Sequence, residues 1–483
     1  MKRIALAAPL LLIGCTVGPQ HPTTALSLAP PVLPERIAAA SGPDQTIAPG
    51  TALDAEWWHR FRNPVLDTLV ARALRSNNDL AVADAALRQA RAQLVIAGAA
   101  GKPQVDASYQ AERARVSQAL QSPLADPNQT LYTLHTAQLS VTYPLDLFGA
   151  ERNRKRSARA AADVAGDRLL AARTTIVANL VLAVIQHASL AAQIDAANDS
   201  ISGNRDILQM LQRRQALGDI GAADVAAQQT VLSTAEALLP PLIRQRDHQR
   251  TLIALLLGVA PGTPLPDLPR LETLTLPDTL PVGLPAQIVA GRPDVRAAEA
   301  QMRGAGADLG VAIAARLPNI LLTATGGSTA VDFGGLFASG NPFWALLGGV
   351  TQPIFHAGAL RGQQHVAEAA LDSAKAQYRS AALQAFADVA DSLSGLRTDA
   401  TALDAATRAN DAATQNLRFT RRQLALGGVG TLTVFNATAA SAQATALLIQ
   451  ARAARMADTV ALYQAVGGGV LASGNPQGIT GAK

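Results

Sequence analysis

The sequence predicts a mainly α-helical chain that contributes four strands to a transmembrane β-barrel and consists of two copies of one unit. Three observations lead to this prediction. The 483 residues are rich in alanine and only 4% aromatic, a composition that favours closely packed helices. Segments recur at constant offsets along the chain. Two stretches alternate between apolar and polar residues, as barrel strands do.

Residues 1–14 are predicted to be an export signal. A basic start precedes an apolar stretch from Ile4 to Leu12. About nine apolar residues are too few to cross a bilayer as a helix, which takes about twenty. The stretch ends in Leu-Ile-Gly-Cys, which resembles the bacterial lipobox. That resemblance implies cleavage before Cys15, a diacylglycerol on its thiol and an N-acyl chain on its amine.

Residues 15–50 are predicted to form a lipidated tether, because Pro, Thr and Ala recur there without periodicity. Thr16 stands where the enteric pattern places the Asp that retains lipoproteins at the inner membrane, so the resemblance points to the outer membrane. A buried free cysteine behind an ordinary signal peptide is the alternative. One cysteine excludes an intramolecular disulfide framework and a multi-cysteine zinc site.

Beyond the tether, the strongest feature is an internal repeat. Early in each copy, matching residues stand 215 positions apart: Asp79 and Asp294, Arg88 and Arg303, Pro103 and Pro318. Later they stand 209 apart: Pro144 and Pro353, Gly149 and Gly358, Gly218 and Gly427. The difference predicts one length change, in a loop between Pro103 and Pro144.

Each copy is predicted to contain a helix, a β-hairpin, a very long helix, a tight turn and a last helix. In the first repeat, residues 51–260, these are Pro64–Ala100, a hairpin near 104–143, Arg152–Gln215, a tip at 216–223 and Ala222–Leu257. In the second, residues 293–467, they are Pro293–Ala315, a hairpin near 319–352, Arg361–Leu424, a tip at 425–432 and Leu432–Val466. A 64-residue helix is roughly 95 Å long, so each long helix should run antiparallel to two shorter ones.

Other segments interrupt the helices. Residues 258–292 are rich in proline and join the two copies, and residues 468–483 are predicted to form a flexible tail. Pro240-Pro241 lies inside a predicted helix and should kink it.

The two hairpins carry the pattern of lipid-facing barrel strands. Val105 to Glu112 and Thr136 to Tyr143 both alternate apolar and polar residues. A half-buried sheet of a soluble domain would look similar. Export, the lipid tether and helices too long for a globule favour the membrane. The second hairpin is less regular, because Phe343 to Leu347 is apolar throughout.

Four strands cannot stand in lipid with unpaired edges, because each unpaired peptide group costs several kcal/mol there. The chain is therefore predicted to oligomerise. Two chains would give an eight-stranded barrel filled by side chains, and three would give a twelve-stranded barrel with a lumen.

Two groups of segments resemble signatures of the TolC-like outer-membrane factors, in the lipoprotein branch that serves resistance-nodulation-division (RND) efflux pumps. The first is Trp57-Trp58-x-x-Phe61-x-Asn63-Pro64 with Asn78-Asp79-Leu80. The second is Gly283-Leu284-Pro285 followed by Arg292-Pro293-Asp294-Val295-Arg296-Ala297-Ala298-Glu299. The resemblance covers essentially the whole mature chain.

This resemblance implies a homotrimer with a twelve-stranded barrel in the outer membrane and a helical tunnel across the periplasm. The Pro-rich segment 258–292 becomes an equatorial girdle. The tips meet a periplasmic membrane-fusion adaptor, which is joined to an inner-membrane RND pump. The implied function is a passive exit duct for drugs or other small toxic solutes.

The resemblance also assigns roles at the tips. Gly218 and Gly427 match the family's tip glycines, whose missing side chain lets the adaptor approach, and Gly221 and Gly430 complete the two turns. The simpler reading, that glycine only makes the turn, holds equally well.

A constriction near the tips is implied at Asp224, Thr433 and Asn436. Asp224 matches an acidic position of the family, whereas Thr433 and Asn436 stand where relatives often carry aspartates. This departure predicts weak block by divalent cations.

Motifs of enzymes are absent from the sequence: there is no Gly-x-Ser-x-Gly, no phosphate-binding glycine loop with Lys, and no His-Glu-x-x-His. We therefore expect no enzyme activity, no metal and no cofactor besides the covalent lipid. His356 and His365 would point about 180° apart on a helix. The basic run Arg152–Arg156 is too short and isolated to indicate nucleic acid. The net charge of +5 suggests no partner.

Two alternatives remain open at the level of sequence. The same fold would serve as the outer duct of a type I protein-secretion system, although the lipobox and the Arg-Pro-Asp-Val segment favour efflux. A lipid-anchored helical scaffold without a pore belongs to a different class, and conductance in planar bilayers separates it from both ducts.

Overall fold

The structure is a computed structural model that describes residues 17–19, 36–37, 44–51, 53–115, 131–282 and 291–469. The chain divides into two compact units. The first comprises residues 1–25, 86–165 and 298–378, and the second residues 26–85, 166–297 and 379–483. Helices make up most of the described residues, so the mainly helical fold class is confirmed.

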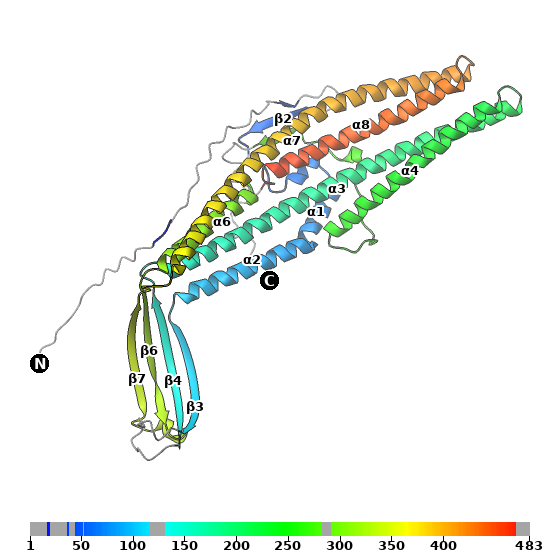
Figure 1. The fold of residues 1–483 in the computed structure, drawn as a ribbon. Coiled ribbons are helices and arrows are strands. Elements are labelled where there is room, and N and C mark those ends of the chain that lie inside the picture. The colour runs from blue at the N-terminus through cyan, green and yellow to red at the C-terminus, as the bar shows by residue number, and fades with distance from the viewer. Residues whose placement is uncertain are drawn as a thin grey trace. The chain divides into compact units, whose positions relative to one another are not determined.

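The first unit contains a four-stranded antiparallel sheet in the order β3-β4-β6-β7 (Figure 1). Its strands are β3 (Gln104–Arg115), β4 (Leu131–Leu145), β6 (Asn319–Ala330) and β7 (Pro342–Thr351). The strands are longer than the alternating stretches of the sequence, because cross-strand pairing extends to the ends of each hairpin. A short 3₁₀ helix, η3 (Gly334–Phe337), lies between β6 and β7.

Four helices lead into and out of this sheet. They are α2 (Asn78–Ala100), α3 (Ala150–Ala216), α6 (Pro293–Ala314) and α7 (Ala359–Ala425). Each begins or ends within nine residues of a strand. The bounds of the two long helices lie within two residues of the sequence prediction, since a glycine stands within two residues of each end.

The second unit holds the hairpins of long helices and the main hydrophobic core. In it α4 (Ala222–Leu256) follows the tip after α3, and α8 (Thr431–Ala465) follows the tip after α7. The helix α4 continues through Pro240 and Pro241, although each missing N–H leaves a carbonyl four residues earlier without its helical donor.

The core of the second unit explains the aromatic signature near residue 57. The 3₁₀ helix η1 (Trp57–Phe61) buries Trp57 and Phe61, and Trp57 packs on Tyr463 of α8 with ring centroids 5.4 Å apart. Asn63 then caps α1 (Pro64–Ser76) by accepting hydrogen bonds from the N–H groups of Val65 and Leu66.

A three-stranded sheet, β1-β2-β5, also belongs to this unit. It consists of β1 (Arg36–Ile37), β2 (Gln45–Pro49) and β5 (Thr279–Val282), with β2 and β5 parallel. A 3₁₀ turn, η2 (Leu271–Thr273), precedes β5. The fully buried Gln45 side chain accepts a hydrogen bond from Arg455 Nε and donates to the Pro277 carbonyl. These contacts join β2 to helix α8.

The predicted helix Pro64–Ala100 is two helices in the structure, α1 and α2, which meet at Asn77. Asn77 has an extended backbone, and its side chain accepts from the N–H groups of Asp79 and Leu80 while donating to the Leu256 carbonyl. Gly258 packs on Ser76 with φ +68°, where a β-carbon would collide with the Ser76 carbonyl. A tertiary contact therefore breaks the helix.

Candidate functional site

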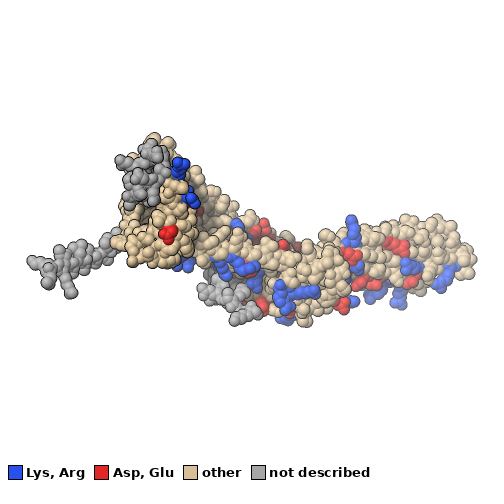
Figure 2. Space-filling view, turned by 90° about the horizontal axis from the view of Figure 1, so that it is seen from below, with Lys and Arg blue, Asp and Glu red and all other residues tan. Residues whose placement is uncertain are grey.

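The register of the four strands separates an apolar face from a polar face. One face carries Val105, Tyr109, Leu139, Val141, Leu322, Ala324, Trp344, Leu346 and Val350. The other carries Gln104, Asp106, Gln138, Ser140, Thr142, Thr323, Thr325 and Leu347. Figure 2 shows few charged side chains on the sheet surface turned to the viewer. Apolar-out and polar-in faces are the pattern of a membrane barrel.

Pairing with β6 assigns the faces of the irregular strand β7. Leu346 lies opposite Ala324 on the apolar face, and Leu347 lies opposite Thr323 on the polar face. Trp344 and Leu346 are 83% and 73% exposed in the single chain. In this described sheet, β3 and β7 each have one partner strand, so both edges are available for pairing with other copies.

The first tip joins α3 to α4 through a tight turn. Gly218 has φ +80°, and its N–H donates to the Gln215 carbonyl, while the N–H of Asp219 donates to the Arg214 carbonyl. These bonds satisfy carbonyls at the end of α3. The positive φ makes glycine the favoured residue at position 218.

The second tip repeats this geometry between α7 and α8. Gly427 has φ +73°, and the N–H of Gly428 donates to the Gln423 carbonyl. By contrast, Gly221 and Gly430 have extended backbones, with φ −82° and −80°. A β-carbon at either would meet nothing within 4 Å, so neither the backbone nor packing within the chain requires glycine there.

Asp224 contacts the second tip within the same chain. Its Oδ1 accepts a hydrogen bond of 2.9 Å from Thr431 Oγ1, at the first residue of α8. Thr433 and Asn436 are exposed on α8. Of the three predicted constriction residues, the structure therefore places Asp224 in a bond to the neighbouring tip.

A cavity of about 900 Å³ extends from the Asp224–Thr431 contact between α3, α4 and α8. Alanine, leucine and valine make up about half of its lining, Phe435 of α8 is also apolar, and the other lining residues are polar. Buried Gln228 bonds to the main-chain and side-chain oxygens of Asn204. Among the described residues, the polar contacts between the two tip hairpins include Thr431–Asp224 and Gln450–Gln193.

The Arg-Pro-Asp-Val segment forms a partly buried ion-pair cluster in the second unit. Arg292 is 11% exposed; its guanidinium contacts Asp294 at 2.7 Å and Asp388 of α7 at 2.7 Å, and donates to the Ala465 carbonyl at the end of α8. Burial by itself would lower the pKa of Arg292. The hydrogen bonds and negative charges of Asp294 and Asp388 outweigh this effect and raise the pKa of Arg292. Burial likewise opposes ionisation of Asp294, yet Arg292 lowers its pKa overall. One side chain therefore ties together three helices.

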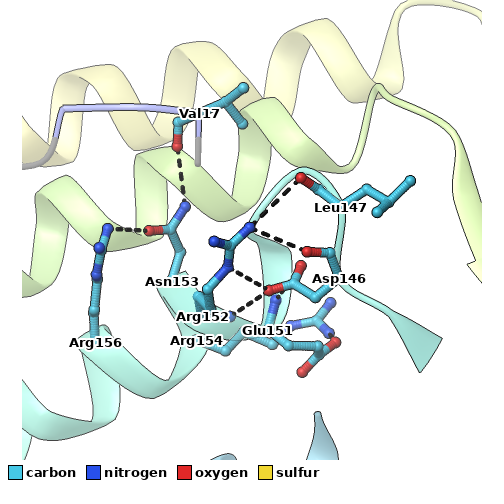
Figure 3. A network of polar contacts seen from close by, with 8 residues as sticks. All are labelled: Val17, Asp146, Leu147, Glu151, Arg152, Asn153, Arg154 and Arg156. Atoms are coloured by element: carbon cyan, nitrogen blue, oxygen red, sulfur yellow. Dashed lines mark hydrogen bonds and ion pairs between the residues drawn. The ribbon is translucent and has the colours of Figure 1, made fainter. Parts of the chain in front are cut away.

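The chain just after Cys15 is docked on the first unit (Figure 3). The Val17 N–H donates to the Phe148 carbonyl at 3.2 Å, and the Asn153 side chain donates to the Val17 carbonyl at 3.0 Å. Gly18 has φ +104°, and a β-carbon on it would lie 2.6 Å from the Gly310 Cα. Close approach of the two backbones therefore requires glycine at position 18.

Comparison with known proteins decides the family. The model of the family described as outer membrane efflux protein matches residues 69–259 and 284–468. This chain belongs to the outer membrane efflux protein family. The resemblance identified from the sequence is confirmed.

Relatives of this efflux protein match it over nearly its whole length. Pyoverdine export outer membrane protein OpmQ of Pseudomonas putida is 30% identical over 472 residues, covering 95% of this chain and 96% of OpmQ. Toluene efflux pump outer membrane protein TtgF of the same species is 30% identical, covering 96% of each chain. The solved structure of the outer-membrane channel OprN superposes with a TM-score of 0.85 and 25% identity, covering 94% of this chain and 99% of OprN.

These similarities confirm two predictions made from the sequence. The efflux protein acts in the outer membrane, and its class is that of efflux channels. The proteins it resembles are named as efflux components and channels.

Other predictions lie outside the described residues. Cys15, the signal 1–14 and the Gly283-Leu284-Pro285 segment fall there, as does the tail from residue 470 onward. The roles of the tip and constriction residues stay predictions.

The sequence did not reveal a pair of half-buried carboxyl groups on α7 and α8 of the efflux protein. Asp399 and Asp458 share a hydrogen bond, and Gly395 leaves room for Asp458, since a β-carbon there would collide with its carboxylate. Burial and the neighbouring Asp458 raise the pKa of Asp399 to about 6, while Arg455 acts in the opposite direction. Burial also raises the pKa of Asp458.

Asp399→Asn is expected to reduce a pH dependence of stability. Because the folded pKa of about 6 exceeds the unfolded value of 3.8, the folded state binds the proton more tightly, and stability falls as pH rises from about 4 to 6. After solvent screening we expect a loss of about 1 kcal/mol in the native protein and a smaller loss in Asp399→Asn, where burial still raises the pKa of Asp458. Thermal unfolding of the purified protein at pH 4.5 and 7.5 measures it. The exposed Asp411→Asn is the control and should retain the native pH dependence.

Proposed function

We propose that this efflux protein forms, as a homotrimer, the passive outer-membrane duct of a tripartite RND-type efflux pump. The observation that carries the proposal is the open sheet with one apolar and one polar face. Two chains would close eight strands around a bore filled with side chains, whereas three would close twelve strands around a lumen. Edge pairing between copies removes the cost of unpaired peptide groups in lipid.

The polar face lines the lumen in this proposal. It carries the threonine, serine and glutamine side chains of β4 and β6, which suit a water-filled path. The protein has no role as an enzyme, and energy for transport comes from an inner-membrane RND pump joined through a periplasmic membrane-fusion adaptor. The names of the relatives, which include pyoverdine and toluene, support small organic solutes as the transported class.

Duplication of one unit accounts for the two halves of the tunnel. The element order from α1 to α4 resembles the order from α6 to α8, and the two tips share their turn geometry. Both copies then contribute one β-hairpin to the barrel and one helical hairpin to the tunnel.

The lipid anchor belongs to the same proposal. Cys15 receives the diacylglycerol and N-acyl chains, and two residues further on Val17 is bonded to Asn153. A two-residue span is at most about 7 Å. Docking of Val17 therefore holds the acyl chains next to the beginning of α3, beside the sheet.

Conductance and drug sensitivity test the duct. The purified protein should form trimers and conduct ions in planar bilayers, and deletion of its gene should sensitise cells to solvents, dyes or drugs. A protein without conductance would be a scaffold. Conductance with unchanged sensitivity and loss of a secreted protein would instead indicate a type I secretion duct.

The tip glycines are proposed to admit the adaptor. Gly221→Trp should reduce efflux at least about 10-fold, because its side chain enters the open space at the tip without straining the backbone. Gly221→Ala is the matched control and should keep efflux within about twofold. Both variants should assemble and conduct in bilayers without adaptor. Efflux by Gly221→Trp equal to that of the native protein would show that this space is not used.

Gating in this proposal depends on the contact between the tips. The Asp224–Thr431 bond holds the two hairpins together beside the cavity, and docking of the adaptor separates them. Weak divalent-cation block follows from the exposed Thr433 and Asn436, which carry no charge.

A further inference from the structure

Basic residues stand at every junction between a helix and the sheet of the first unit. Lys102 precedes β3, the run Arg152–Arg156 lies at the start of α3 after β4, Arg316 precedes β6, and Arg361 lies at the start of α7 after β7. Seven Lys and Arg residues and two acidic residues occupy the connecting segments 100–103, 145–156, 315–318 and 352–362. The junctions are therefore the most positively charged level of this unit.

The two acidic residues are already occupied by arginines of the same run. Asp146 accepts from the Arg152 main chain at 2.9 Å and from its side chain at 3.2 Å (Figure 3). Glu151 pairs with Arg154. Neither carboxylate is therefore free to neutralise the remaining bases.

Five bases remain, which we call the basic collar: Lys102, Lys155, Arg156, Arg316 and Arg361. All five are exposed, and within the described residues the contacts found for Arg156 and Arg316 are to the amide oxygens of Asn153 and Gln364. Their charges therefore face solvent or an external partner.

With the sheet spanning the hydrocarbon as proposed, the collar falls at the outer edge of the headgroup layer, within reach of long side chains. The strands are 10 to 15 residues long, and tilted strands of 9–11 residues span the hydrocarbon. Arg156 is six residues into α3, about 9 Å along the helix axis, and the headgroup layer is about 5–7 Å thick on each side. Long basic side chains reach such a layer while their stems pack on apolar surface.

Apolar side chains accompany the basic ones at the last junction. Ile354 and Phe355, between β7 and α7, are 88% and 85% exposed. A surface that combines exposed apolar side chains with nearby cations suits the boundary between acyl chains and phosphates. A protein partner would more often meet one continuous patch, whereas the collar is spread over all four junctions.

We propose that the basic collar binds the phosphates of anionic phospholipids in the periplasmic leaflet of the outer membrane. Arg156 donates to Asn153, the residue that also holds Val17, so the collar adjoins the segment that follows the lipid-bearing Cys15. Together the acyl anchor and the headgroup contacts fix the depth of the sheet in the membrane. The proposal rests on the proposed membrane-spanning sheet and is independent of the transported solute.

The test is lipid retention by the purified full-length protein. The protein is equilibrated in micelles containing equal amounts of phosphatidylglycerol and phosphatidylcholine, and the bound lipids are quantified by native mass spectrometry. We expect at least about 10-fold preference for phosphatidylglycerol. Each basic residue near an anionic surface contributes about fivefold, so the triple variant Lys102→Gln, Arg156→Gln, Arg361→Gln should lose most of the preference.

A matched control replaces three exposed arginines of the second unit, Arg408, Arg418 and Arg422, by glutamine. This control should keep the native preference. Millimolar glycerol 1-phosphate should not displace the lipid; displacement would mean that the collar is a site for soluble phosphate. Equal retention of both lipids by the native protein, or equal loss in control and collar variants, overturns the proposal.

Assembly of the triple variant is checked by its trimer content. If the triple variant fails to assemble, the single variant Arg156→Gln and a salt titration of the native protein decide. The preference should fall several-fold between 50 mM and 1 M salt, because screening weakens surface electrostatics. A salt-independent preference contradicts the proposal.

Discussion

Leu346→Arg is expected to abolish accumulation of the protein in the outer membrane. Leu346 is the fifth of ten residues in β7, lies on the apolar face and is 73% exposed in the single chain. An arginine on the lipid face at the bilayer midplane costs about 2–4 kcal/mol. In a trimer that cost occurs three times, about 6–12 kcal/mol, which exceeds the stability margin of many proteins. Quantifying the trimer in outer-membrane fractions measures the effect.

Leu347→Arg is the matched control for this prediction. Leu347 is the next residue and 66% exposed, but the register places it opposite Thr323 on the polar face. Because the polar face lines the lumen of the proposed trimer, the charge should leave assembly nearly unchanged and shift ion selectivity in planar bilayers towards anions. If both variants assemble equally, or if Leu347→Arg is the one that is lost, the assignment of the faces is wrong.

Sequence patterns predicted the elements of this fold because each depends on local signals. Alternation identified the strands of the first hairpin, and glycine marked the ends of the long helices within two residues. Periodicity failed at Phe343–Leu347, where every residue is apolar. Only pairing with β6 shows which of these side chains share a face.

The break at Asn77 was not predictable from local pattern. Asn77 and its partner Leu256 are 179 positions apart, and both sides of the break have helix-forming composition. An asparagine between helical stretches favours a cap, but the cap is stable here because a carbonyl of another helix accepts from its side chain. A contact of this kind depends on the tertiary structure, and the local sequence carries no signal of it.

The candidate site was predictable only in part for the same reason. The tip glycines and Asp224 could be placed by the repeat and the family resemblance. The partner of Asp224 is Thr431, 207 positions away, and Asp399 meets Asp458 across two helices. Which residues of two packed helices face each other depends on how the helices are aligned, and composition does not determine that alignment. Asp and Thr are also common on exposed helix surfaces, so neither residue type signals a contact.

Arg292 belongs to the motif that identified the family, yet its role depends on residues far from that motif. Its guanidinium contacts Asp388 and the Ala465 carbonyl, 96 and 173 positions away. We expect Arg292→Ala to lower the unfolding free energy by about 3 kcal/mol per chain. Removing the partly buried guanidinium leaves two carboxylates uncompensated, of which Asp388 is 33% and Asp294 45% exposed. Chemical denaturation of the purified protein, followed by circular dichroism, measures the loss.

Arg303→Ala provides the control for this prediction, in helix α6, which begins one residue after Arg292. Arg303 also contacts two carboxylates, those of Asp163 and Glu299, but all three side chains are 45–48% exposed. Exposed pairs contribute about 0–1 kcal/mol, so this variant should lose less than about 0.5 kcal/mol. Arg292→Lys should fall between the two alanine variants, since an ammonium cannot reach both carboxylates and the carbonyl with fixed geometry. Equal losses for Arg292→Ala and Arg303→Ala would mean that burial of the Arg292 cluster adds nothing to its stability.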